Sequence, residues 1–146
     1  MQVSSDVITS FQELRQKQTG PSFLIFKMEK GQCVIEKRGQ ADSSFADFVA
    51  ALPSDTARWA VTTVKFQTNG GGLRSKVVFV SWIPSTANKV DKMSYAMFQG
   101  TLRQAITGCQ CVVSAHDLSD LDPNAVLERA GKYERDGIDM EAGLLN

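Results

Sequence analysis

Few residues in this sequence have the types and the spacing that chemistry on a substrate would need. The one histidine, His116, is followed by Asp117, and neighbours in sequence rarely form a catalytic acid–base pair. The cysteines, Cys33, Cys109 and Cys111, do not have a zinc-site spacing with that histidine. We therefore expect no catalytic residue, no metal site and no enzymatic activity.

A glycine-rich segment, NGGGLRSK (69–76), combines glycines with a basic end, as phosphate-binding loops do. It lacks the G-x-x-x-x-G-K-[ST] spacing, and it lies between two predicted strands rather than before a helix. We interpret it as the turn of a β-hairpin.

The most unusual pattern lies in a helix predicted over about 90–106. At 100° per residue, one apolar stripe faces the core. The opposite face carries methionines and small residues, with two lysines at its N-terminal end. The residues of this second face are Lys89, Lys92, Met93, Ala96, Met97 and Gly100.

This second face has two interpretations. Methionine adapts to the shape of a partner, so an outward methionine face predicts a partner surface. Gly100 agrees with this interpretation, because a glycine inside a helix costs up to about 1 kcal/mol and close approach of a partner would justify it. The alternative is a helix that is buried on both sides within the protein itself.

Charge gives a weaker signal. Lys and Arg number 16, as do Asp and Glu, so the formal net charge is zero and a nucleic-acid partner is not expected. Arg74 and Lys76 should project from one face of a predicted strand. The last predicted helix turns Val126, Leu127, Ala130 and Tyr133 inward and has a charged outer side, which is usually only solvated.

The hydrophobic periodicity predicts one domain over 1–135 and a weakly structured tail over 136–146. The strand predicted over 75–83 is almost wholly apolar, so we expect helices on both faces of the sheet. The fold class is α/β (α+β), with a mixed five-stranded sheet sandwiched between helices. Strands are predicted at 23–29, 33–39, 58–67, 75–83 and 109–115, and helices at 5–17, 45–52, about 90–106 and 123–135.

The sequence also gives expectations about location. No apolar run approaches the ~20 residues of a membrane span. The first residues lack a basic start followed by an apolar block, so we see no secretion signal. Three unpaired cysteines are typical of reduced thiols in the cytoplasm.

Several segments together resemble one known family. LRSKVVFVSWIPSTANKVDKMSYA (73–96) resembles the stretch of actin-depolymerising factor/cofilin proteins that runs from the fourth strand into the long helix. AVLERA (125–130) is similar to the family's final-helix motif, and FQELR (11–15) and FADFVAALP (45–53) match two further helices. The similarity spans roughly residues 3–132 in register.

The resemblance implies an actin-binding protein of the cytoskeleton, acting as a monomer, that binds actin monomers and filaments, severs filaments and promotes depolymerisation. It implies no cofactor. It also implies two sites, carried over by position. The monomer-type site takes in the N-terminal segment 1–5 and the long helix, with Ser4, Ser5, Lys89, Lys92, Met93, Ala96 and Met97. The filament site comprises Arg74, Lys76, Glu128, Arg129 and Lys132.

The sequence departs from the family pattern in charge. Val90 and the pair Gln99–Gly100 replace residues that are often charged in relatives. These changes leave open a coactosin-like filament binder, or a monomer-sequestering protein with weak severing. The regulatory serine of relatives is missing, and we interpret Ser4 and Ser5 as helix caps. Phosphoinositides, meeting the basic residues of both sites, are a further regulatory alternative.

Overall fold

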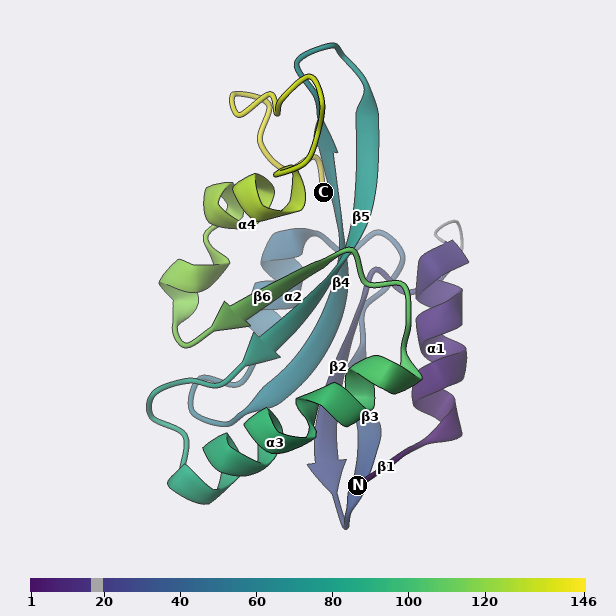
Figure 1. Cartoon of the computed structure of the whole chain (residues 1–146), viewed down its shortest axis with the longest axis vertical. Coiled ribbons are helices and arrows are strands. Elements are labelled where there is room, and N and C mark those ends of the chain that lie inside the picture. The colour runs from purple at the N-terminus through teal and green to yellow at the C-terminus, as the bar shows by residue number, and fades with distance from the viewer. Residues whose placement is uncertain (17–19) are drawn as a thin grey trace.

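The computed structural model describes residues 1–16 and 20–146. Within these ranges the chain forms one mixed sheet of six strands with helices on both faces (Figure 1). The strands are β1 (Gln2–Val3), β2 (Phe23–Glu29), β3 (Gln32–Arg38), β4 (Arg58–Gln67), β5 (Leu73–Trp82) and β6 (Cys111–Ala115). The helices are α1 (Ser5–Gln16), α2 (Phe45–Ala51), α3 (Lys89–Ala105) and α4 (Pro123–Ala130), with a short 3-10 helix, η1 (Leu118–Leu121).

The strand order is β1-β3-β2-β4-β5-β6, parallel at the two outer pairs and antiparallel between. On β5, Val78 and Val80 join the core under α2 and α4. Val77 and Phe79 join the core under α1 and α3. The apolar strand is therefore covered on both faces, as its composition predicts.

Local signals explain where several elements begin. Ser44 and Asp47 form the capping box expected for α2, because each side chain accepts the other residue's backbone N–H, at 3.1 and 2.9 Å. Asp122 caps α4, and Pro123 occupies its first turn. The turn between β2 and β3 has positive φ at Lys30 and Gly31, where we predicted a turn.

The strand count corrects the sequence prediction of five. The additional strand is β1, which pairs in parallel with the start of β3. The N–H of Gln2 donates to the carbonyl of Gly31, and the N–H of Ser4 to that of Cys33, both at 3.0 Å. A two-residue strand has no periodicity, so the sequence carried no signal for it.

The end of the last helix was predicted wrongly. Helix α4 stops at Ala130 rather than Arg135, because Gly131 ends it with its N–H on the carbonyl of Leu127. Tyr133 was expected to pack inward, but its side chain is 88% exposed. Other bounds move by one or two residues, and the last predicted residue of the first helix, Lys17, lies outside the described residues.

The segment 136–146 contains no helix or strand but is packed against the sheet. It follows the part of β4 that β2 does not reach, with the N–H of Leu145 on the carbonyl of Lys65 at 2.8 Å. The Asn146 side chain bonds the N–H of Lys65 and the carbonyl of Thr63. Ile138 packs on the core under α4. The division of the chain at residue 135 stays a prediction.

Among the residues that the structure describes, no helix is long and apolar enough to cross a membrane.

Candidate functional site

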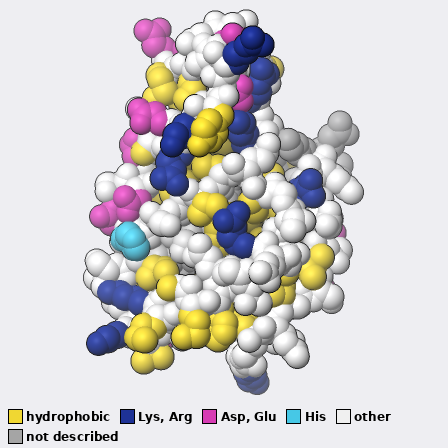
Figure 2. All heavy atoms as spheres, viewed as in Figure 1, with side chains coloured by type: hydrophobic (Ala, Val, Ile, Leu, Met, Phe, Trp, Pro, Cys, Tyr) yellow, Lys and Arg dark blue, Asp and Glu magenta, His cyan; other side chains and the backbone are white. Residues whose placement is uncertain are grey.

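The outward face of α3 is apolar and uncovered. Met93 is 58% exposed, Met97 68% and Val90 72%. Figure 2 shows hydrophobic side chains gathered along the lower edge of the molecule, where α3 lies in Figure 1. The alternative of a helix buried on both sides is therefore wrong. We call this face the α3 surface, defined by Lys89, Val90, Lys92, Met93, Ala96, Met97 and Gly100.

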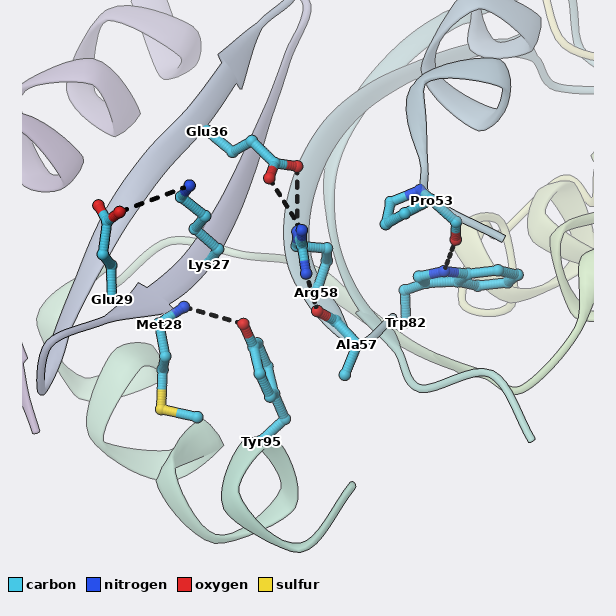
Figure 3. A network of polar contacts seen from close by, with 9 residues as sticks. All are labelled: Lys27, Met28, Glu29, Glu36, Pro53, Ala57, Arg58, Trp82 and Tyr95. Atoms are coloured by element: carbon cyan, nitrogen blue, oxygen red, sulfur yellow. Dashed lines mark hydrogen bonds and ion pairs between the residues drawn. The ribbon is translucent and has the colours of Figure 1, made fainter. Parts of the chain in front are cut away.

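Tyr95 fixes which side of α3 faces outward. Its hydroxyl accepts the backbone N–H of Met28 at 2.9 Å, which ties the helix to the end of β2 (Figure 3). Its ring lies 4.5 Å from that of Trp59, and the Trp59 indole N–H donates to the Tyr95 carbonyl at 3.2 Å. Burial raises the pKa of Tyr95, so the hydroxyl stays neutral. With Tyr95 held inward, Met93 and Met97 must point outward.

The N-terminal end of α3 is ordered by side chains. Asn88 caps the helix by accepting the Asp91 N–H at 2.8 Å, and its amide donates back to the Asp91 carboxylate. The Lys92 ammonium donates to the carbonyl of Ser85 in the preceding loop. Lys92 is therefore held close to the helix start, while Lys89 is exposed.

Gly100 lies where α3 borders a shallow hollow of about 490 Å³, which reaches across to Ser114 and His116. A Cβ added at Gly100 would have no atom within 4 Å. The packing of the described residues therefore does not require a glycine here.

The predicted filament-site residues lie on β5 and α4, except Lys132, which lies in the turn after α4 because the helix ends at Ala130. Arg74 and Lys76 project from one face of β5, as their spacing predicts, and both pair with Glu134 at 3.1 Å. Figure 2 shows Lys and Arg side chains gathered in the upper part of the molecule, over β5 and α4. We call these residues the basic surface, defined by Arg74, Lys76, Glu128, Arg129 and Lys132.

The outer side of α4 lines a second hollow of about 490 Å³ against β6. Glu128, Arg129 and Lys132 lie along it, and the Arg129 guanidinium donates to the carbonyl of Val112 on β6. Ser114 borders both hollows. Figure 1 shows β6 between α3 and α4, which cover opposite faces of the sheet, so the α3 surface and the basic surface flank this edge strand.

The serines of the N-terminal segment have structural roles. The Ser4 hydroxyl accepts the N–H of Asp6 at 3.3 Å, and the Ser4 carbonyl accepts that of Val7. Ser4 is therefore the cap, whereas the interpretation of Ser5 as a second cap is wrong, because Ser5 is the exposed first residue of α1. Val3 packs against the same core as the inward face of α3.

Sequence reasoning left one ordered region out, the turn that leads into η1. The Asp117 carboxylate accepts the N–H of Ser119, and the hydroxyl of Ser119 lowers the pKa of Asp117. The Asp120 carboxylate accepts the N–H of His116 at 2.8 Å. This turn holds Leu118 out in solvent beside the groove that His116 borders. The sequence did contain a signal for this region, because Leu118 is an apolar residue between Asp117 and Asp120 in a predicted loop.

A metal or thiol centre finds no support in the described part of the chain. There, no group of three His, Cys, Asp or Glu side chains is placed to share a metal ion. The three cysteines are free thiols, and burial raises the pKa of Cys33 to about 12 and that of Cys109 to about 11.

Comparison with known proteins decides the family. The model of cofilin/tropomyosin-type actin-binding proteins matches residues 1–131. The chain belongs to this family. Actin-depolymerizing factor 2 of Petunia hybrida is 35% identical over 136 residues, which is 92% of this chain and 94% of that protein. The cofilin of Schizosaccharomyces pombe is 35% identical over 133 residues, covering 88% and 93%.

A solved structure agrees with this assignment. The cofilin of Streptomyces griseoflavus matches with a TM-score of 0.80 and 30% identity, covering 88% of this chain and 97% of that one. The mixed sheet with helices on both faces is thus the cofilin fold. The family consists of non-enzymatic actin-binding proteins.

Proposed function

We propose that this protein binds actin monomers and filaments, severs filaments and promotes their depolymerisation and turnover in the cytoplasm. The observation that carries the proposal is the α3 surface, where Met93 and Met97 are exposed in a protein of the cofilin family. An exposed apolar face on a rigid helix is a ready contact for another protein.

The α3 surface supports a helix-in-groove contact. Val90, Met93 and Met97 recur at three- and four-residue spacing, so one hydrophobic groove on actin can bury all three. Burial of each methionine in such a groove contributes about 1–2 kcal/mol. Lys89 and Lys92 lie at the edge, where charges set encounter rate and register more than affinity.

The basic surface supports a second contact that only a filament supplies. Because the two surfaces lie at separate places on one domain, two neighbouring actin subunits can be engaged together, and the second contact then forms at a high effective concentration. Severing follows if the protein binds one filament conformation better than another, since a ligand shifts an equilibrium only by its differential affinity.

Two actin assays test the proposal. Purified protein should co-pellet with actin filaments, and labelled filaments should shorten under time-resolved microscopy. Filament lengths that stay unchanged at saturating protein would remove severing from the proposed function. Co-pelleting without shortening would instead support the coactosin-like alternative, which the uncharged positions Val90, Gln99 and Gly100 motivate.

Charge reversals separate the two contacts. We expect Lys92→Glu to weaken binding to actin monomers. We expect Arg74→Glu combined with Lys76→Glu to weaken binding to filaments only. A loss of the same size in both assays for each variant would contradict a two-site protein.

Phosphoinositides as regulators rest on Lys89, Lys92, Arg74 and Lys76. The structure gives this idea little support, because Lys92 bonds the Ser85 carbonyl and the other pair is engaged by Glu134. Flotation with vesicles that contain phosphatidylinositol bisphosphate, without actin, tests it. A protein that stays at the bottom of the gradient is not regulated by this route.

A further inference from the structure

Glu134 occupies a tight turn directly after α4. Its N–H donates to the carbonyl of Gly131 at 3.0 Å, and its carbonyl accepts the N–H of Gly137 at 3.2 Å. Asn69, at the tip of the β4–β5 hairpin, bonds the carbonyls of Asp136 and Gly137, both at 3.1 Å. The position of the Glu134 carboxylate is therefore fixed from two sides, by α4 and by the hairpin.

The carboxylate of Glu134 is divided between two cations of the basic surface. One oxygen lies 3.1 Å from Arg74 Nε, and the other lies 3.1 Å from Lys76 Nζ. The Glu134 side chain is only 12% exposed. The hydrogen bond from Lys76, followed by that from Arg74, holds the pKa of this carboxyl below its usual value. At neutral pH the negative charge is therefore present.

An acidic surface on a partner would meet cations that are already paired. The partner must either displace Glu134 from Arg74 and Lys76 or share these two cations with it. If the cations are shared, the partner's carboxylates lie close to the negative charge of Glu134. Like charges at a contact oppose binding. Glu134 does not compete with a partner for the α3 surface, because the ion pairs of Glu134 are with Arg74 and Lys76 of the basic surface.

We propose that Glu134 is an internal competitor for the acidic partner of the basic surface, and that it lowers filament affinity without changing monomer affinity. This inference rests on the proposed function, because it takes Arg74 and Lys76 to be filament contacts. The test must distinguish this role from the opposite one, in which Glu134 holds the two cations in a binding-competent arrangement. The two roles predict opposite signs when the charge is removed.

The experiment compares wild-type protein with Glu134→Gln and Glu141→Gln in co-pelleting with actin filaments across a range of ionic strength. Glu141 is exposed in the same terminal segment and makes no ion pair within the described residues, so it matches the charge change. We expect Glu134→Gln to bind filaments about threefold more tightly, the scale of a single ion pair near the protein surface. Its affinity should also fall more steeply with salt.

A double-mutant cycle protects the test against an effect on folding. In a protein that already carries Arg74→Gln and Lys76→Gln, the change Glu134→Gln should leave filament affinity unaltered. Equal or weaker filament binding by Glu134→Gln alone, with wild-type protein binding normally, would overturn the inference and leave the proposed function intact. Wild-type protein that does not co-pellet at all would overturn both.

Discussion

The α3 surface and the basic surface flank the edge strand β6 but differ in how far the protein's own residues cover or pair them. The α3 surface leaves Met93 and Met97 uncovered. The basic surface has its two β5 cations paired with Glu134. An uncovered apolar face supplies affinity that depends little on salt, whereas a paired charge must exchange partners before it contributes. Under the proposed function, the first surface supplies most of the affinity for actin and the second the selectivity for filaments.

The largest effect is expected from Met97→Glu. A charge at this position must be desolvated in the actin groove, so monomer affinity should fall about 100-fold, or about 2.7 kcal/mol. Because Met97 is exposed, the free energy of unfolding should change by less than about 0.5 kcal/mol. Titration of fluorescent actin monomers measures the first quantity, and urea unfolding the second.

Leu145→Glu is the matched control for this change. Leu145 is also an exposed apolar residue, but it lies outside both surfaces. Its substitution should leave monomer affinity within about twofold of the wild-type value, consistent with a neutral surface position. If both variants lost affinity alike, the distinction between the α3 surface and the rest of the exterior would fail.

A smaller effect is expected from Tyr95→Phe, which tests whether the α3 surface is presented by a fixed helix. Loss of the hydroxyl leaves the Met28 N–H without its acceptor, which should lower the free energy of unfolding by about 1–2 kcal/mol. Urea unfolding gives this value directly. The salt dependence of filament binding should not change, and a change in it would show that Tyr95 also serves the basic surface.

Gly100→Ala should have effects of opposite sign on stability and binding. The added methyl group meets no atom within 4 Å, so the helix should gain about 0.5–1 kcal/mol of stability. If Gly100 serves close approach of actin, monomer affinity should fall. Thermal unfolding and monomer titration on the same preparation check both. A variant that is more stable and binds as well as wild type removes Gly100 from the α3 surface.

The smallest effect is on pH dependence and concerns only the basic surface. The pKa of Glu134 is lowered by Lys76 and Arg74, so the folded state binds fewer protons there than the unfolded state. Its contribution to stability is present above the unfolded-state pKa and is lost as pH falls through the folded-state pKa. The difference in unfolding free energy between wild type and Glu134→Gln should therefore shrink on acidification. A difference that stayed constant across this range would contradict the pairing.

Local patterns predicted the α3 surface because a helix converts sequence spacing directly into direction. The spacing placed Met93 and Met97 opposite Tyr95 and Leu102, and the structure has them exposed and buried respectively. The family resemblance rested on the same stretch of sequence. What the spacing could not supply was the bond from Met28 to Tyr95, which joins residues 67 positions apart.

The surroundings of the basic surface were beyond local reasoning. Arg74 and Glu134 are 60 residues apart and meet only because the chain returns from α4 to the β4–β5 hairpin. A continuing charged pattern suggested that the last helix ran to Arg135, although Gly131 was the stop signal. Because the predicted helix was too long, Tyr133 was predicted to pack inward, and Glu134 was not predicted to pair with Arg74 and Lys76.

Methyl NMR of the methionines tests the central claim most directly, because the five methionines of the chain include two on the α3 surface. On addition of actin monomers, the methyl signals of Met93 and Met97 should shift or broaden to saturation. The signals of Met28 and Met140, which lie outside this surface, should stay in place. Unchanged Met93 and Met97 signals at saturating actin would contradict the claim that this face of α3 is where actin binds.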